Sequence, residues 1–106
     1  MQFDNVTLVC KANVYFGGKV ISYTFIMPDG KTRKTIGVIF PGTFDFTTGY
    51  PENMLITAGR LHVSIPSLSV GSVYVAGQDF NVPSNTTFQV TCLDGPVEYV
   101  CTYKQG

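Results

Sequence analysis

Apolar and polar residues alternate with a period of two along most of this 106-residue chain. In residues 20–26, the apolar Ile21, Tyr23 and Phe25 alternate with Ser22 and Thr24. Runs that alternate in this way, or that are rich in β-branched and aromatic residues, recur at 35–40, 43–48, 61–65, 87–93 and 97–103. A period of two indicates strands with one buried face, and no long run has the helical period. We therefore predict an all-β chain.

Short turn sequences separate these runs, among them PDG at 28–30, GYP at 49–51 and DGP at 94–96. Many short strands joined by such turns are typical of a small β-barrel or a double-sheet jelly roll. No linker, repeat or low-complexity tract interrupts the pattern, so we predict one domain over residues 1–106. Residues 1–12 carry several apolar side chains and are predicted to form an extra N-terminal strand.

Composition and charge exclude several function classes. Hydrophobic residues make up 44% of the chain and charged residues 13%, which is typical of an ordered globular protein. Seven basic residues balance seven acidic ones, so we expect no binding to the nucleic-acid backbone, which requires clustered cations. The N-terminal sequence has no long apolar stretch, so we expect neither a signal peptide nor a membrane partner. Cys10, Cys92 and Cys101 form no CxxC pair, which favours reduced thiols in a cytoplasmic protein.

Two turn motifs resemble those of the cupins, which are small jelly-roll barrels. Glu52 is followed by six residues and then Gly59, as in the second half of the first cupin motif. Gly77 is followed by five residues and Pro83, as in the second motif, and Asn85 stands at a family Gly, where it tolerates a positive φ.

The metal ligands of these motifs are missing. Counting back from Glu52, the His positions of the first motif fall on Asp45 and Thr47, or on Phe46 and Thr48. In the second motif, the His position falls on Phe88. A transition-metal site needs three or four converging ligands, so we expect no metal.

A closer resemblance covers nearly the whole chain. Five runs carry it, in order and with consistent spacing: ANVYFGGKV (12–20), KTIGVIFPGTFDFTTGYPENM (34–54), AGRLHVSIP (58–66), AGQDFNVPSNTTF (76–88) and EYVCTY (98–103). They resemble the cupin-type pyrimidine/purine nucleoside phosphorylases. The resemblance implies a metal-free cupin barrel, a homodimer, and a pentosyltransferase without a cofactor. Such an enzyme uses inorganic phosphate to cleave purine and pyrimidine ribonucleosides into free base and ribose 1-phosphate.

The chain departs from this family at three places. Many relatives carry a Trp in the loop that spans residues 67–74 here, and this chain has none. Some relatives carry an Arg in place of Tyr23, and an acid or Thr in place of Leu55.

Phosphorolysis needs a group that binds phosphate and a group that stabilises positive charge on the ribose. Arg33, Lys34, Lys19 and Arg60 are candidates for phosphate, and we favour Arg33 because it matches a basic position of the family. The alternative is that Arg33 solvates the tip of a hairpin. Glu52 is predicted to bind the ribose hydroxyls or to stabilise the oxocarbenium charge. Its alternative is an exposed turn residue beside Pro51.

Recognition of many bases favours stacking, because every base offers a π-face. The predicted substrate-binding residues are Tyr15, Phe16, Phe44, Asp45, Tyr50 and Tyr99, with Phe46 as a further aromatic candidate. Aromatic side chains in a barrel are also common core residues. His62 could protonate a leaving base, although its place opposite Leu61 and Val63 also fits a side chain that faces solvent.

Three other interpretations stay open at the level of sequence. The chain could be a non-catalytic cupin that binds nucleosides, nucleotides or sugar phosphates. It could be a metal-dependent cupin enzyme that recruits its ion through Glu52, Asp45 and His62. It could also be a structural protein that assembles through edge strands.

Overall fold

The computed structural model describes residues 1–66 and 71–104, which form eleven strands and one short 3-10 turn. The strands are β1 (Thr7–Leu8), β2 (Asn13–Tyr15), β3 (Val20–Ile26), β4 (Arg33–Ile39), β5 (Gly42–Thr47), β6 (Glu52–Ala58), β7 (Arg60–Ser64), β8 (Ser72–Val75), β9 (Asp79–Val82), β10 (Thr87–Cys92) and β11 (Val97–Tyr103). The 3-10 turn η1 (Phe16–Gly18) joins β2 to β3. The prediction of an all-β chain is confirmed.

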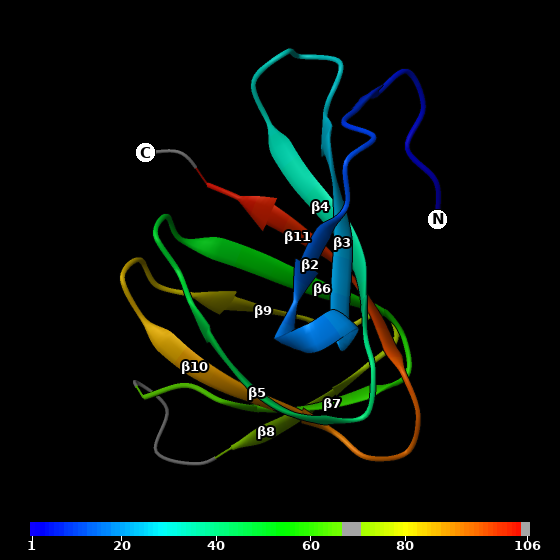
Figure 1. Cartoon of the computed structure of the whole chain (residues 1–106). Helices are drawn as coiled ribbons and strands as arrows, with labels where there is room; N and C mark the ends of the chain where they lie inside the picture. The colour runs from blue at the N-terminus through cyan, green and yellow to red at the C-terminus, as the bar shows by residue number, and fades with distance from the viewer. Residues whose placement is uncertain (67–70, 105–106) are drawn as a thin grey trace.

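The strands form two antiparallel sheets that face each other (Figure 1). Sheet A has the order β1-β3-β4-β11-β6-β9, and β2 also pairs with β3. Sheet B has the order β5-β10-β7-β8. Within the described residues, no pair of hydrogen-bonded strands joins the two sheets, so they do not close into the predicted barrel.

Most of the predicted strand runs are found, and four strands, β2, β6, β8 and β9, lie outside them. β3 and β11 have the predicted bounds, and β5 shows the predicted alternation, with Phe44 and Phe46 turned inward and Asp45 and Thr47 exposed. β2, β8 and β9 have only three or four residues each, which is too short for a clear period. Within residues 1–12, the strand β1 covers Thr7–Leu8.

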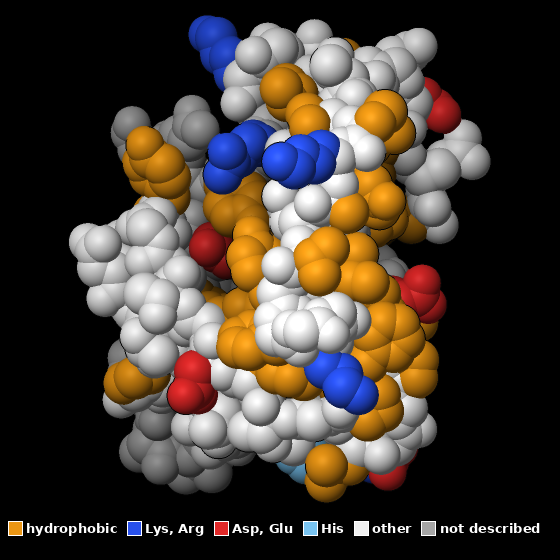
Figure 2. Space-filling model, in the orientation of Figure 1, with side chains coloured by type: hydrophobic (Ala, Val, Ile, Leu, Met, Phe, Trp, Pro, Cys, Tyr) orange, Lys and Arg blue, Asp and Glu red, His pale blue; other side chains and the backbone are white. Residues whose placement is uncertain are grey.

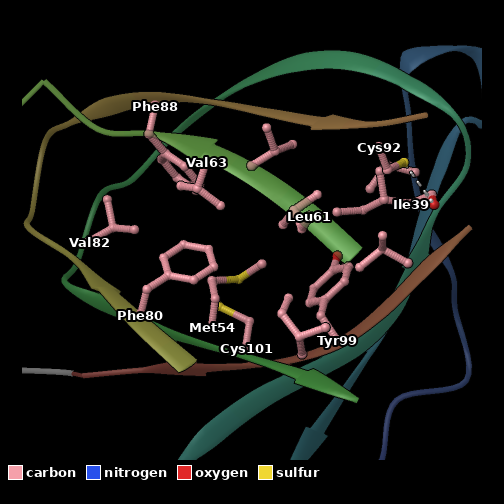
Figure 3. Close-up of a cluster of buried hydrophobic side chains, with 14 of the residues drawn as sticks. Ile39, Met54, Leu61, Val63, Phe80, Val82, Phe88, Cys92, Tyr99 and Cys101 are labelled. Atoms are coloured by element: carbon pink, nitrogen blue, oxygen red, sulfur yellow. Dashed lines mark hydrogen bonds between the residues drawn. The ribbon is translucent and has the colours of Figure 1, made fainter. Parts of the chain in front are cut away.

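The hydrophobic core lies between the sheets. Figure 3 shows Met54, Tyr99 and Cys101 from sheet A directed toward Leu61 and Phe88 from sheet B. Seven aliphatic residues of this core are at most 1% exposed: Val20, Ile39, Ile56, Leu61, Val82, Val90 and Val97. Each such side chain contributes roughly 1.5–3 kcal/mol to folding, so this layer holds the two sheets together.

The glycine of the first turn motif lies where the chain crosses from one sheet to the other. Glu52 begins β6 in sheet A, and Gly59 separates β6 from β7 in sheet B. Gly59 has φ 87°, and a β-carbon there would lie 2.7 Å from the Pro96 carbonyl oxygen. The spacing from Glu52 to Gly59 therefore sets the length of β6. The predicted positive φ of Asn85 is also confirmed, at 50°.

Gly37 is required by close packing inside sheet A. It lies in register between Ser22 of β3 and Tyr99 of β11. A β-carbon at this position would lie 2.7 Å from the Ile21 carbonyl oxygen, 2.8 Å from the Ser22 β-carbon and 2.8 Å from the Tyr99 hydroxyl. The glycine of the TIGV run therefore leaves space for the Tyr99 hydroxyl above the sheet.

We expect Gly37→Ala to lower the free energy of unfolding by about 1–3 kcal/mol, because the methyl group forces backbone or Tyr99 to move. Urea denaturation followed by circular dichroism measures this change. Gly49→Ala is the control, since a β-carbon at 49 meets nothing within 4 Å. Equal stability of the two variants would contradict this account of Gly37.

Candidate active site

A cavity of about 610 Å³ opens between sheet A and the β5–β10 side of sheet B. Its volume is in the range of small-molecule sites. Figure 2 shows Lys and Arg side chains grouped beside a recess that hydrophobic side chains border, with an acidic group set in it. The recess thus combines apolar surface with both signs of charge.

The cavity brings together seven of the eight residues that the sequence singled out for binding or catalysis. Arg33, Glu52, Tyr15, Phe16, Asp45, Tyr50 and Tyr99 all line it. Phe44 does not. It packs instead beneath Phe16, with ring centroids 4.9 Å apart, and so supports the wall without forming it. Phe46 does line the cavity and lies 5.6 Å from Phe16.

Strand register explains why the residues of sheet A converge here. The period of two turns residues 33, 35 and 37 of β4 and residues 99, 101 and 103 of β11 toward the cavity side. β11 lies between β4 and β6, so Arg33, Tyr103 and Glu52 stand in one row across three strands. Alternate residues of the paired runs TIGV and YVCTY therefore contribute to the floor of one site.

The next rows of the floor are rich in hydroxyl and amide groups. Thr24, Thr35 and Cys101 form the second row, and Asn13 lies in register with Ser22 beyond it. The Asn13 amide donates hydrogen bonds to the hydroxyls of Ser22, at 3.3 Å, and Thr24, at 3.2 Å. Ser22 and Thr35 are buried, so this floor presents ordered polar groups of the kind that bind sugar hydroxyls.

Glu52 is half-buried at the start of β6, which excludes the alternative of an exposed turn residue. Its Oε1 accepts a hydrogen bond from the Cys101 thiol at 3.3 Å. Burial raises the pKa of the Glu52 carboxyl, and the thiol hydrogen bond and the positive charge of Arg33 offset part of that rise. Burial also raises the pKa of the Cys101 thiol, which therefore stays protonated and acts as the donor.

Arg33 lies at the exposed mouth of the cavity, at the first residue of β4. Its guanidinium carbon is 4.8 Å from the centroid of the Tyr103 ring, a cation–π contact. The hairpin before it is held by Asp29, which accepts backbone hydrogen bonds from Lys31 and Thr32, both at 2.8 Å. These bonds and the Thr32 hydroxyl lower the pKa of Asp29 to about 2.

The other basic candidates lie elsewhere. Lys34 faces the opposite side of sheet A, where its Nζ donates to the Thr102 hydroxyl at 2.7 Å and lies 5.4 Å from the Phe3 ring. Lys19 is not part of the lining, and Arg60 lines a separate, smaller hollow next to Asp94. Strand alternation thus separates Arg33 from its neighbour Lys34.

Aromatic side chains form the outer part of the site. Tyr15, Phe16 and Tyr50 are each about half exposed, at 52%, 45% and 54%. Phe16 has φ 53°, and Gly17 and Gly18 after it also have positive φ. A bulky residue in this region is unusual and needs support from its surroundings, here the rings of Phe44 and Phe46. The backbone therefore fixes an aromatic face at the mouth.

The comparisons with known proteins bear directly on this arrangement. Residues 10–103 match the profile of the family described as pyrimidine/purine nucleoside phosphorylase. The chain belongs to this family. A pyrimidine/purine nucleoside phosphorylase of Burkholderia vietnamiensis is 48% identical over 96% of this chain and 94% of its own length. One from Cupriavidus necator is 48% identical over 96% of this chain and 95% of its own length.

Solved structures of relatives agree with the fold. A protein of unknown function from Acinetobacter sp. ADP1 superposes with a TM-score of 0.90 at 43% identity, over 97% of this chain and 98% of that one. The described fold is therefore shared with that protein over nearly all of both chains.

Two of the positions at which the chain departs from the expected family pattern lie away from the cavity. Tyr23 and Leu55 stand in one row on the outer face of sheet A, with Ile36 and Val100 between them. Of the loop without a Trp, residues 67–70 lie outside the described part of the chain. The cavity itself thus keeps its acid, its cation and its aromatic groups.

The metal-dependent alternative loses its proposed ligand set. His62 is exposed on the outer face of β7, in register with Val73 and Thr91 of sheet B, so it does not face the cavity. The exposed Asp45 accepts a hydrogen bond from Gln89 at 3.2 Å. In residues 1–66 and 71–104, no three His, Cys, Asp or Glu side chains gather closely enough to hold an ion.

Sequence reasoning missed Cys101, Tyr103 and the hydroxyl floor. All of them alternate with outward residues on strands that were predicted, so their inward direction was readable. Their proximity to Glu52 could not be predicted, because the order of the strands in the sheet cannot be read from the sequence.

No helix in the described residues is long and apolar enough to span a membrane.

The raised pKa of Glu52 predicts a pH-dependent stability. Below the ordinary value of 4.5, the carboxyl is protonated in both folded and unfolded chains. As the pH rises through the higher folded-state pKa, the unfolded chain releases its proton first, and stability is lost. We expect Glu52→Gln to be more stable than wild type at about pH 8, with the advantage vanishing at about pH 4. Urea titrations at both pH values measure it.

The control for removal of one negative charge is Glu98→Gln, on the exposed outer face of β11. A gain of the same size in Glu98→Gln, or a gain in Glu52→Gln that does not change with pH, would show that burial of Glu52 is not its cause.

Proposed function

We propose that this protein is a nucleoside phosphorylase that converts a purine or pyrimidine ribonucleoside and inorganic phosphate into free base and ribose 1-phosphate. The observation that carries the proposal is the convergence of Glu52, Arg33 and an aromatic mouth on one cavity. The family membership supports the same reaction, because relatives across the full length bear this name.

The proposed reaction breaks the C1′–N bond and forms a bond between C1′ and a phosphate oxygen, while the leaving base gains a proton. Positive charge develops on the ribose as the base departs. Glu52 acts as the group that binds the ribose hydroxyls or stabilises this charge. Arg33 binds the phosphate, because a guanidinium matches its oxygens with a fork of donors.

The spacing of the two groups suits a substrate between them. Arg33 and Glu52 stand in register with β11 between their strands, so their Cα atoms are separated by two strand spacings, about 10 Å. The hydroxyl floor of Ser22, Thr24 and Thr35 lies beneath that space. Because Tyr103 lies between the two groups, a phosphate bound to Arg33 and a ribose bound to Glu52 would lie over its ring, with the base directed outward.

Base recognition is assigned to Tyr15, Phe16 and Tyr50, with Asp45 and Tyr99 completing the substrate-binding set. An aromatic face accepts every base, and each stack contributes about 1–3 kcal/mol in single-stranded nucleic-acid complexes. Half-exposed rings at a mouth do not read the hydrogen-bonding edge of the base. This arrangement supports tolerance of both purines and pyrimidines.

The proposal includes a cupin-type jelly roll that acts without metal or organic cofactor. The positive φ of Gly59 and Asn85, at turn positions of the cupin motifs, supports the fold assignment. The separation of His62 from Glu52 supports catalysis by side chains alone. We also propose a cytoplasmic location, which the three free Cys favour and cell fractionation tests.

We further propose a homodimer. The outer face of sheet A carries an apolar hollow of about 510 Å³, lined by Phe3, Leu8, Ile36 and Leu55 among others. Ile36 is 46% exposed and Leu8 55% exposed, and an apolar surface of this kind favours association. The molar mass from light scattering tests it.

Purified protein incubated with adenosine or uridine is expected to release free base and ribose 1-phosphate only when phosphate is present. Chromatography of the base and an enzymatic assay of the sugar phosphate measure both products. Thermal stabilisation by nucleoside without any product would identify the non-catalytic binder instead. Loss of turnover in Glu52→Gln, with the fold retained, is expected from the same assay.

Arg33→Ala is expected to raise the KM for phosphate by about tenfold or more, since a charged hydrogen bond contributes about 1.5–3 kcal/mol. The matched control is Lys34→Ala, which removes the adjacent positive charge from the opposite face of the sheet. If both substitutions changed the phosphate KM equally, the assignment of Arg33 as the phosphate-binding residue would be wrong.

A further inference from the structure

The Tyr103 ring stands between the two opposite charges of the cavity. On β11, it is in register with Arg33 of β4 on one side and with Glu52 of β6 on the other. All three side chains line the same cavity. Across the three strands, the row therefore consists of a cation, an aromatic ring and a carboxylate, in that order.

Each charge makes its contact with β11 and not with the other. The Arg33 guanidinium lies over the Tyr103 ring at 4.8 Å. The Glu52 carboxylate accepts its hydrogen bond from Cys101. The Tyr103 hydroxyl lies 3.4 Å from the Thr35 hydroxyl, which ties the far end of the ring to β4. Among the described residues, Arg33 and Glu52 form no ion pair.

Without the ring, nothing in this row would keep the charges apart. About 10 Å between Cα atoms is a distance that a long Arg side chain and a Glu side chain can bridge together. Opposite charges in a half-buried site attract strongly, because water screens them less there. An ion pair would occupy the guanidinium fork and would hold the carboxylate permanently charged.

We propose that Tyr103 is a positioning residue that prevents Arg33 and Glu52 from pairing, so that the guanidinium stays free for an anion and the carboxyl stays free for the sugar. That the anion is phosphate and the sugar a ribose rests on the proposed function. The separation of the charges does not depend on it.

Other side chains also face Glu52. Cys101 and Tyr99 on β11 are uncharged, because burial raises the pKa of both. On the other side of Glu52, β9 offers the apolar Val82. Tyr15 lines the cavity from the end of β2, Tyr50 from the turn before β6 and Asp45 from β5. Arg33 is thus the cation among the described lining residues that a shortened Tyr103 would release toward Glu52.

The test is the titration of the Glu52 carboxyl, followed by carbon-13 NMR, in wild type, Tyr103→Phe and Tyr103→Ala. Tyr103→Phe keeps the ring and is expected to leave the pKa of Glu52 above its ordinary value of 4.5 and the phosphate KM within about twofold of wild type. Tyr103→Ala is expected to lower the pKa of Glu52 below its ordinary value of 4.5. Better access of water alone would lower it only to that value.

A second substitution separates pairing from solvent access. In Tyr103→Ala combined with Arg33→Gln, the pKa of Glu52 is expected to return to 4.5 or above, since no cation remains to pair with it. If Tyr103→Ala does not fold, Tyr103→Leu replaces it, because Leu keeps apolar bulk but loses the flat face that carries the guanidinium. The same double substitution then applies.

The positioning role is overturned if the pKa of Glu52 in Tyr103→Ala, or in Tyr103→Leu, stays at or above its ordinary value. It is also overturned if Arg33→Gln leaves a lowered value unchanged. Both readouts are independent of turnover. A protein that shows the expected titrations but no phosphorolysis would contradict the proposed function and leave the role of Tyr103 intact.

Discussion

The antiparallel pairing of β11 with β4 on one side and β6 on the other decides which side chains reach the cavity. It directs Tyr99, Cys101 and Tyr103 inward and aligns them with residues 37, 35 and 33 and with residues 56, 54 and 52. A slip of one residue would turn this whole set to the outer face. The buried aliphatic layer between the sheets resists such a slip, because it would expose Val97, Ile39 and Ile56 at the same time.

That register places the Glu52 carboxyl in a partly buried position, and neighbouring side chains offset part of its lost hydration. A half-buried carboxyl loses hydration, which is why the pKa of Glu52 rises. The Cys101 thiol donates one weak hydrogen bond to the Glu52 carboxylate. Tyr103 lies where the Arg33 guanidinium would otherwise donate a stronger hydrogen bond to it. In residues 1–66 and 71–104, no buried side-chain nitrogen or oxygen lacks a hydrogen-bond partner. The site is thus polar and internally satisfied, with Glu52 left incompletely paired, as a binding group requires.

Local pattern was enough to predict much of this architecture. Alternation gave β3, β5 and β11, and the E-x6-G spacing pointed to Glu52. The parts that could not be predicted depend on which strands are neighbours. Tyr103 is one more aromatic residue in the sequence, and its meaning comes from β4 and β6 on its two sides. The barrel was expected from the pattern of short strands and turns and from the resemblance to cupin motifs, yet neither specifies the hydrogen bonds between distant strands. Phe44 was assigned to the site because of its residue type, whereas its neighbour Phe16 covers it.

The side chains of the cavity come from two kinds of backbone, paired strands and the segments at the mouth. This difference affects how firmly each part of a substrate would be held. The charged and hydroxyl groups of the floor project from paired strands, whose register leaves little freedom, and this suits a sugar and an anion of fixed geometry. Among the aromatic groups of the mouth, Phe16 comes from η1, where ring packing and a positive φ hold it, while Tyr15 ends β2 and Tyr50 lies in the turn before β6. Such a site is selective for the groups that bind to the floor and tolerates variation in the group that stays at the mouth. Under the proposed function, broad base tolerance follows from where the described aromatic residues are attached.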